Sequence, residues 1–144
     1  MSTQVFVNIA TVDLAKSTAF YVALGCEINP LFTDENAACV VWDDRIFFMV
    51  LTREHFATFT DKPVIDAHEG AQVLIALSRE SRADVDKTVT AGLAAGGREP
   101  RDPQDYGFMY SRTVEDPDGN TLEFLYMDPA AAEQGPEEFM AGQG

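Results

Sequence analysis

The order of strand-like and helix-like segments repeats once along the chain, and this repeat constrains the fold more than any other feature of the sequence. Residues 4–12 are apolar and rich in β-branched side chains, as in a strand, and the helix-like segment after them ends at Gly25. Residues 71–78 and the helix-like segment that ends at Gly96 repeat this order. Because further short strands follow each helix, the pattern predicts two βαβββ modules, at about 4–60 and 71–128.

Each predicted helix has its own start signal. Asp13 and Ser81 are residue types that cap a helix N-terminus, and Asp84 adds an acidic variant of the capping box. The apolar stripes that would face the sheets are Leu14, Phe20, Tyr21 and Leu24 in the first helix and Val85, Val89 and Leu93 in the second. The expected class is α+β, with each sheet burying one face against its helix and the other faces curled around a cleft. An ordinary α+β sheet without this symmetry is the alternative.

The length and charge limit the class of protein. A chain of 144 residues suits one domain, which we place at 1–128, followed by a flexible acidic tail at 129–144. The formal net charge of −14 repels phosphate backbones and anionic lipid, so we expect neither nucleic acid nor membrane as a partner. No apolar run is long enough to span a membrane, and the start resembles no secretory signal.

The two cysteines, Cys26 and Cys39, are neither in a CxxC motif nor close to a histidine in the sequence. We expect two buried, reduced thiols in a cytoplasmic protein, because a disulfide would need an oxidising compartment. A single disulfide between them is the alternative.

Three segments together resemble the vicinal oxygen chelate superfamily, which includes glyoxalase I, fosfomycin- and bleomycin-resistance proteins and extradiol dioxygenases. They are VDLAKSTAFYVALG after the first strand, the second helix ending in LAAGG, and EDPDGNTLEFLY at residues 115–126. The sequence is most similar to uncharacterised glyoxalase-like bacterial members. The resemblance implies two βαβββ modules, an eight-stranded incomplete barrel around a cleft, and usually a homodimer.

The resemblance also implies where a metal would lie. In metal-binding members the acid at the position of Glu123 is a ligand, and further ligands come from the first strand of each module. Those positions fall here on Phe6 and on Leu74, with Val73 or Ile75 as neighbouring choices. Hydrocarbon side chains offer no donor atoms, so we expect no bound metal and no cofactor. A metal site made of other residues is the alternative, although His55 and His68 are expected at the surface, remote from the cleft.

Strand alternation and the register of the family predict which side chains line the cleft. The predicted ligand-binding residues are Phe6, Asn8, Phe47, Met49, Leu74, Met109, Ser111, Thr113 and Glu123. Their neighbours on the same faces are Ala10, Leu51, Ala76, Ser78, Thr121 and Leu125. Such a mixture of apolar side chains with a few polar groups is usual in small-molecule sites, and it is equally usual in a collapsed core.

These observations lead to a functional hypothesis and its rivals. The first is a metal-free, glyoxalase/bleomycin-resistance-like protein that binds a small, largely apolar molecule, which it sequesters or acts on through Glu123 as the catalytic residue. Glu123 is alternatively a remnant that Asn8 or a hydroxyl satisfies. The rivals are a metal-dependent lyase, thiol transferase or dioxygenase of the same superfamily, and a non-catalytic structural or regulatory dimer. Whether the protein is an enzyme stays open at this point.

Overall fold

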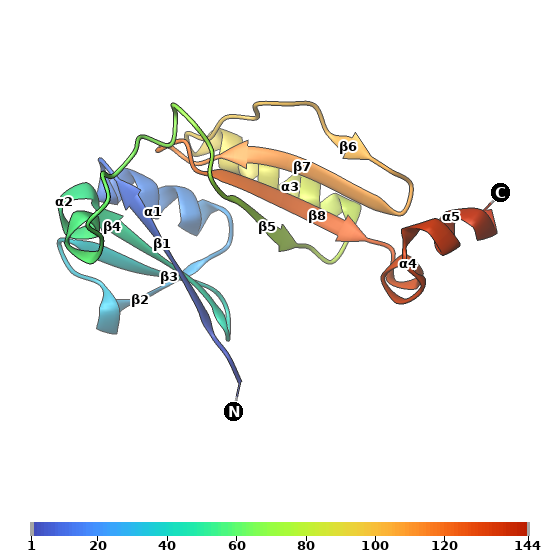
Figure 1. Ribbon diagram of the computed structural model, residues 1–144, viewed down its shortest axis with the longest axis horizontal. Helices are drawn as coiled ribbons and strands as arrows, with labels where there is room; N and C mark the ends of the chain where they lie inside the picture. Colours follow the sequence, from blue (N-terminus) through green and yellow to red (C-terminus); the bar gives the residue numbers. More distant parts are fainter. Residues whose placement is uncertain (1, 144) are drawn as a thin grey trace.

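A computed structural model describes residues 2–143, which form two modules of the same topology (Figure 1). The first contains β1 (Val5–Thr11), α1 (Leu14–Ala23), β2 (Glu27–Asn29), β3 (Ala37–Asp43) and β4 (Ile46–Thr52). The second contains β5 (Leu74–Ser78), α3 (Arg82–Ala94), β6 (Gln104–Asp105), β7 (Met109–Glu115) and β8 (Thr121–Met127). Short helical turns supplement them, at η1 (Pro30–Phe32), α2 (Arg53–Phe56) and η2 (Ala57–Phe59). The predicted pair of βαβββ modules is confirmed.

Each module has its own four-stranded mixed sheet. The strand orders are β1-β4-β3-β2 and β5-β8-β7-β6, and the first strand of each module pairs in parallel with the last. The strands of residues 2–143 therefore form no closed barrel, in agreement with the α+β incomplete barrel predicted from the sequence. β1 and β5 are the edge strands at equivalent positions of the two sheets.

The start and stop signals in the sequence act as predicted. The Asp13 side chain accepts the Lys16 N–H at 3.1 Å, and the Ser81 hydroxyl accepts the Asp84 N–H at 3.0 Å. Gly25 follows α1 with φ of 105°, a conformation that suits glycine. β5 is shorter than predicted, because its partner β8 begins only at Thr121, the residue that pairs with Leu74.

One predicted core position in α3 is wrong. Val85 and Val89 are fully buried, whereas Leu93 is 38% exposed. Residues four apart advance about 400° around a helix, so each step turns about 40° away from the first position. Leu93 has therefore rotated out of the contact, and the buried Gly92 lies against Phe20 of α1 and Leu24, the residue that follows α1.

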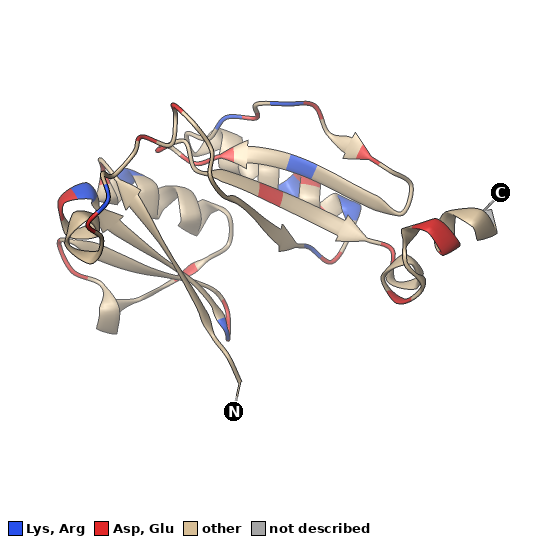
Figure 2. Cartoon of the chain, viewed as in Figure 1, with Lys and Arg blue, Asp and Glu red and all other residues tan. Residues whose placement is uncertain are grey.

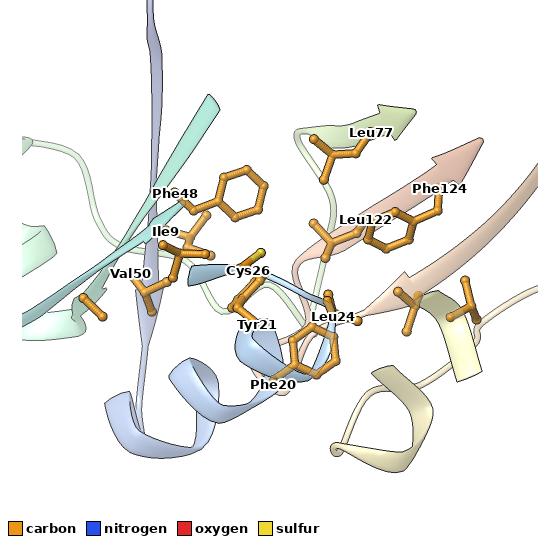
Figure 3. Close-up of a cluster of buried hydrophobic side chains, with 14 of the residues drawn as sticks. Ile9, Phe20, Tyr21, Leu24, Cys26, Phe48, Val50, Leu77, Leu122 and Phe124 are labelled. Atoms are coloured by element: carbon orange, nitrogen blue, oxygen red, sulfur yellow. The ribbon is translucent and has the colours of Figure 1, made fainter. Parts of the chain in front are cut away.

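Both sheets turn their helix-covered faces into one shared core (Figure 3). The first sheet contributes Ile9, Phe48 and Val50, the second contributes Leu77, Leu122 and Phe124, and α1 places Phe20 and Tyr21 between them. Side chains alternate across a strand, so the opposite faces of both sheets point away from this core. The two modules are therefore joined through their helix sides.

The C-terminal segment leaves the second module after β8 (Figure 1). We predicted that it is a flexible acidic tail, and the structure has two short helices there, α4 (Pro129–Gln134) and α5 (Pro136–Gln143), with Ala131 buried. Asp128 and Pro129 explain the start of α4, since the carboxylate accepts the Ala130 N–H and proline suits the first turn. The flexibility of this tail stays a prediction.

Acidic residues are spread over both modules and the tail (Figure 2). Within the described residues, no helix combines the length and the apolar character that a membrane span requires.

Candidate functional site

The first group of predicted site residues lies on the outer face of the first sheet. Phe6 pairs with Phe47 and Asn8 pairs with Met49 between the parallel strands β1 and β4. The rings of Phe6 and Phe47 stack, with centroids 4.8 Å apart and planes inclined by 10°. The Phe6 side of this stack is open, because the residue is 50% exposed. The alternation predicted for both strands therefore agrees with the observed register.

The second group lies on the outer face of the second sheet. Glu123 in β8 stands between Thr113 of β7 and Ala76 of β5, its partners in the two ladders. Ser111 and Met109 lie further along β7, and Leu74 at the start of β5 is 58% exposed. Ser111 and Thr113 are buried, whereas Leu74 on the same face is exposed.

The structure brings the predicted site residues together within each sheet and not across the two sheets. The backs of these faces are the two walls of the shared core, so the faces are turned away from it on different sides. A single chain therefore presents two half-sites: an aromatic one around Phe6 and Phe47, and a more polar one around Glu123.

Glu123 is half-buried, and its carboxylate makes no hydrogen bond or ion pair with any other described residue. Arg112 and Tyr110 of the adjacent strand β7 are engaged elsewhere: Arg112 binds Glu99 at 2.8 Å and Asp86 at 3.0 Å, and Tyr110 donates to Asp86. The hydrogen bonds to Glu99 raise the pKa of Arg112 above its usual range. The alternative in which Asn8 satisfies Glu123 gains no support, since the Asn8 amide donates to the Phe6 carbonyl oxygen.

The residues at the family's metal positions do not fit a metal. Phe6 and Leu74 carry no donor atom, and the neighbouring choices Val73 and Ile75 are also hydrocarbons. Among residues 2–143, no three His, Cys, Asp or Glu side chains gather closely enough to hold an ion. His55 packs edge-on against Phe59 in the helical turns that follow β4.

A cavity of about 820 Å³ lies beside the half-sites, between β1, the start of β5 and the linker at residues 60–73. Asn8 is the one predicted ligand-binding residue that lines it. His68 is exposed at the surface, as predicted, and it also lines this cavity. Sequence reasoning missed Arg53 and Asp118 as cavity residues. The polar composition of the linker predicts a loop. No local pattern predicts which strands and turns that loop covers, so these cavity residues could not be found from the sequence.

Comparisons with known proteins agree with this architecture. The family described as bleomycin resistance protein-like N-terminal matches residues 3–42. A hypothetical protein from S. aureus has 25% sequence identity and a TM-score of 0.74, and the match covers 88% of this chain and 94% of that protein. A glyoxalase/bleomycin resistance protein/dioxygenase family enzyme from Burkholderia phytofirmans has 20% identity and a TM-score of 0.72, covering 88% and 99% of the two chains.

A glyoxalase-related enzyme from Fulvimarina pelagi has 17% identity and a TM-score of 0.73, with 88% of each chain covered. None of the curated proteins matches this sequence. The family match in the first module and the likeness to these structures over both modules show that the chain has the glyoxalase/bleomycin-resistance fold.

Proposed function

We propose that this protein is a metal-free member of the vicinal oxygen chelate superfamily. The protein would bind a small, largely apolar molecule in a cleft completed by two copies of the chain. The observation that carries the proposal is the pair of open half-sites on faces that cannot cover each other within one chain. The first-sheet face of one copy would cover the second-sheet face of the other.

Exposed apolar surface supports the homodimer. Phe6 and Leu74, one on each face, both leave more than a third of their surface open, although large apolar side chains gain free energy when they are buried. A two-fold axis brings each type of face against the other twice, so a single dimer would cover all four faces.

The chemistry of the half-sites suggests the ligand. Phe6, Phe47 and Met49 supply apolar and polarisable contacts, and Ser111 and Thr113 supply hydroxyl groups. Glu123 would then be the one carboxylate in the cleft without a protein partner among the described residues. It would serve as a counter-charge for the ligand or as a general acid or base, which would make the protein an enzyme. The two buried, unpaired cysteines support a cytoplasmic location.

Elemental analysis of the purified protein, followed by ligand-observed NMR with a panel of small aromatic and aliphatic compounds, tests this proposal. We expect substoichiometric metal and hits that weaken about tenfold or more in Glu123→Gln, a loss of roughly 1.4 kcal/mol. Glu35→Gln, which changes an exposed acid, is the matched control. One tightly held metal ion per chain would contradict the metal-free state, and hits indifferent to Glu123→Gln would remove Glu123 from the site.

A further inference from the structure

The cavity beneath the linker differs from the half-sites because it lies within one chain. Its walls are largely apolar, formed by residues such as Val7, Phe56, Val64, Ile65, Ala71 and Val73. Its volume of about 820 Å³ lies within the range of protein pockets that enclose small organic ligands. Polar groups reach the cavity from the DPDG turn and from the linker.

Asp118 in the DPDG turn has a carboxylate oxygen without a hydrogen-bond partner among the described residues. The residue is 9% exposed and lines the cavity. Its Oδ1 accepts the Val12 N–H at 3.0 Å, whereas its buried Oδ2 has no hydrogen-bond partner among the described residues. A buried carboxylate oxygen without a donor is costly, because it has lost water and gained nothing in exchange.

Asp116, two residues earlier in the same turn, differs from Asp118 because both of its carboxylate oxygens accept hydrogen bonds. It accepts the Tyr21 hydroxyl, the Asn120 side-chain amide and the backbone N–H groups of Asp118 and Asn120. The turn therefore needs Asp116 for its own geometry. The free oxygen of Asp118 serves no comparable purpose within the turn.

The charges around the cavity favour a cation. Asp66 stands in the wall, and its pKa is lowered chiefly by the hydrogen bond from the His68 backbone N–H. The guanidinium of Arg53 is held by the linker, donating to the Val64 carbonyl at 2.8 Å and the Ile65 carbonyl at 3.3 Å. Asp66 and Arg53 are thus both engaged, Asp66 by the backbone N–H and the ring of His68 and Arg53 by backbone oxygens, whereas the buried Oδ2 of Asp118 has no partner among the described residues.

The linker forms a close wall over this site. A methyl group at Gly119 would stand 2.7 Å from the His68 backbone nitrogen, so the turn and the linker are in direct contact. We propose that the cavity between β1, β5 and the linker is a second binding site, which takes a small organic ammonium ion with an apolar body. The ammonium group donates to Asp118, and the hydrocarbon lies against Ile65, Val73 and their neighbours.

Hexylammonium, hexanol and hexanoate share a six-carbon chain and differ in the head group, so they test the charge preference directly. Isothermal titration of the whole chain should show hexylammonium binding at least about tenfold more tightly than the other two. Asp118→Asn should remove this preference, while Asp61→Asn, which changes an exposed linker acid outside the cavity, should keep it. Equal binding of the three compounds, or no saturable binding of hexylammonium, overturns the site.

Two further variants keep the test decisive if Asp118→Asn does not fold. Ala71→Trp introduces a large side chain at an exposed position of the cavity wall and should abolish hexylammonium binding. Glu35→Gln should leave hexylammonium binding unchanged, because Glu35 is an exposed acid that does not line this cavity. Unchanged binding in Ala71→Trp, or loss of binding in Glu35→Gln, would place the ammonium ion elsewhere and overturn the proposal. These outcomes do not depend on the metal content or on the dimer.

Discussion

The hydroxyl of Tyr21 donates a 2.7 Å hydrogen bond to the Asp116 carboxylate, and this bond joins the first module to the second inside the core. Tyr21 comes from α1, and Asp116 begins the DPDG turn before β8. Both residues are buried, and Tyr21 also packs edge-on against Phe20, Phe48 and Trp42. One side chain therefore connects the apolar core with the turn that supports the cavity.

Replacing Tyr21 with phenylalanine should lower the free energy of unfolding by about 1–3 kcal/mol, because a buried carboxylate loses a donor while the ring packing is kept. Urea unfolding monitored by circular dichroism measures the loss. Tyr110→Phe is the matched control, since its hydroxyl binds Asp86, a half-exposed acid, and its loss should stay under about 1 kcal/mol. Equal losses of unfolding free energy in the two variants would show that the bond between the modules stabilises the fold no more than the Tyr110–Asp86 bond does.

The same pair predicts a dependence on alkaline pH. Burial first, and then the charge of Asp116, raise the pKa of Tyr21 well above its usual value of 10.0. The unfolded chain ionises this phenol at a lower pH than the folded chain does, so its stabilising contribution is complete below about pH 10 and decreases above it. The difference in unfolding free energy between the native protein and Tyr21→Phe should therefore shrink as pH rises above 10. A constant difference across that range would contradict this assignment.

Both thiols should be unreactive in the folded protein. Burial raises the pKa of Cys26 to about 12, opposed only in part by Arg79, and burial also raises the pKa of Cys39. The thiolate is the reactive form, and both side chains are inaccessible. A disulfide-exchange reagent at pH 8 should label neither cysteine quickly in the native state and should label both in denaturant. Rapid labelling of the native protein would mean that one thiol is exposed.

The Phe6–Phe47 stack offers a test of the proposed dimer. Phe6→Arg places a charge in the face that the second copy would cover, so light scattering should show a shift from dimer to monomer at micromolar concentration. Val22→Arg is the control, because Val22 is 49% exposed, close to the value for Phe6, and lies on α1 away from both half-sites. A wild-type protein that is monomeric at all concentrations would reject the shared cleft.

Much of the fold could be predicted from local chemistry. Asp13 and Ser81 start the helices, Gly25 follows the first helix, and Pro30 ends the short strand β2, all within a few residues of the signal that specifies them. The two-residue alternation of strands correctly grouped Phe6 with Asn8 and Thr113 with Glu123 on common faces. Leu93 shows the limit of a four-residue spacing, which drifts around the helix.

The strands and the two long helices of the modules, their order and the two faces of each strand follow from local sequence, because those properties depend on residues close together in the chain. Tertiary structure alone decided that α1 and α3 share one core, that the outer faces diverge, and that the linker encloses a cavity beside Asp118. These features depend on contacts between residues far apart in the chain, such as Tyr21 with Asp116 and Val12 with Asp118. No local pattern encodes such a contact, since many partners of similar size and polarity would satisfy the same periodicity.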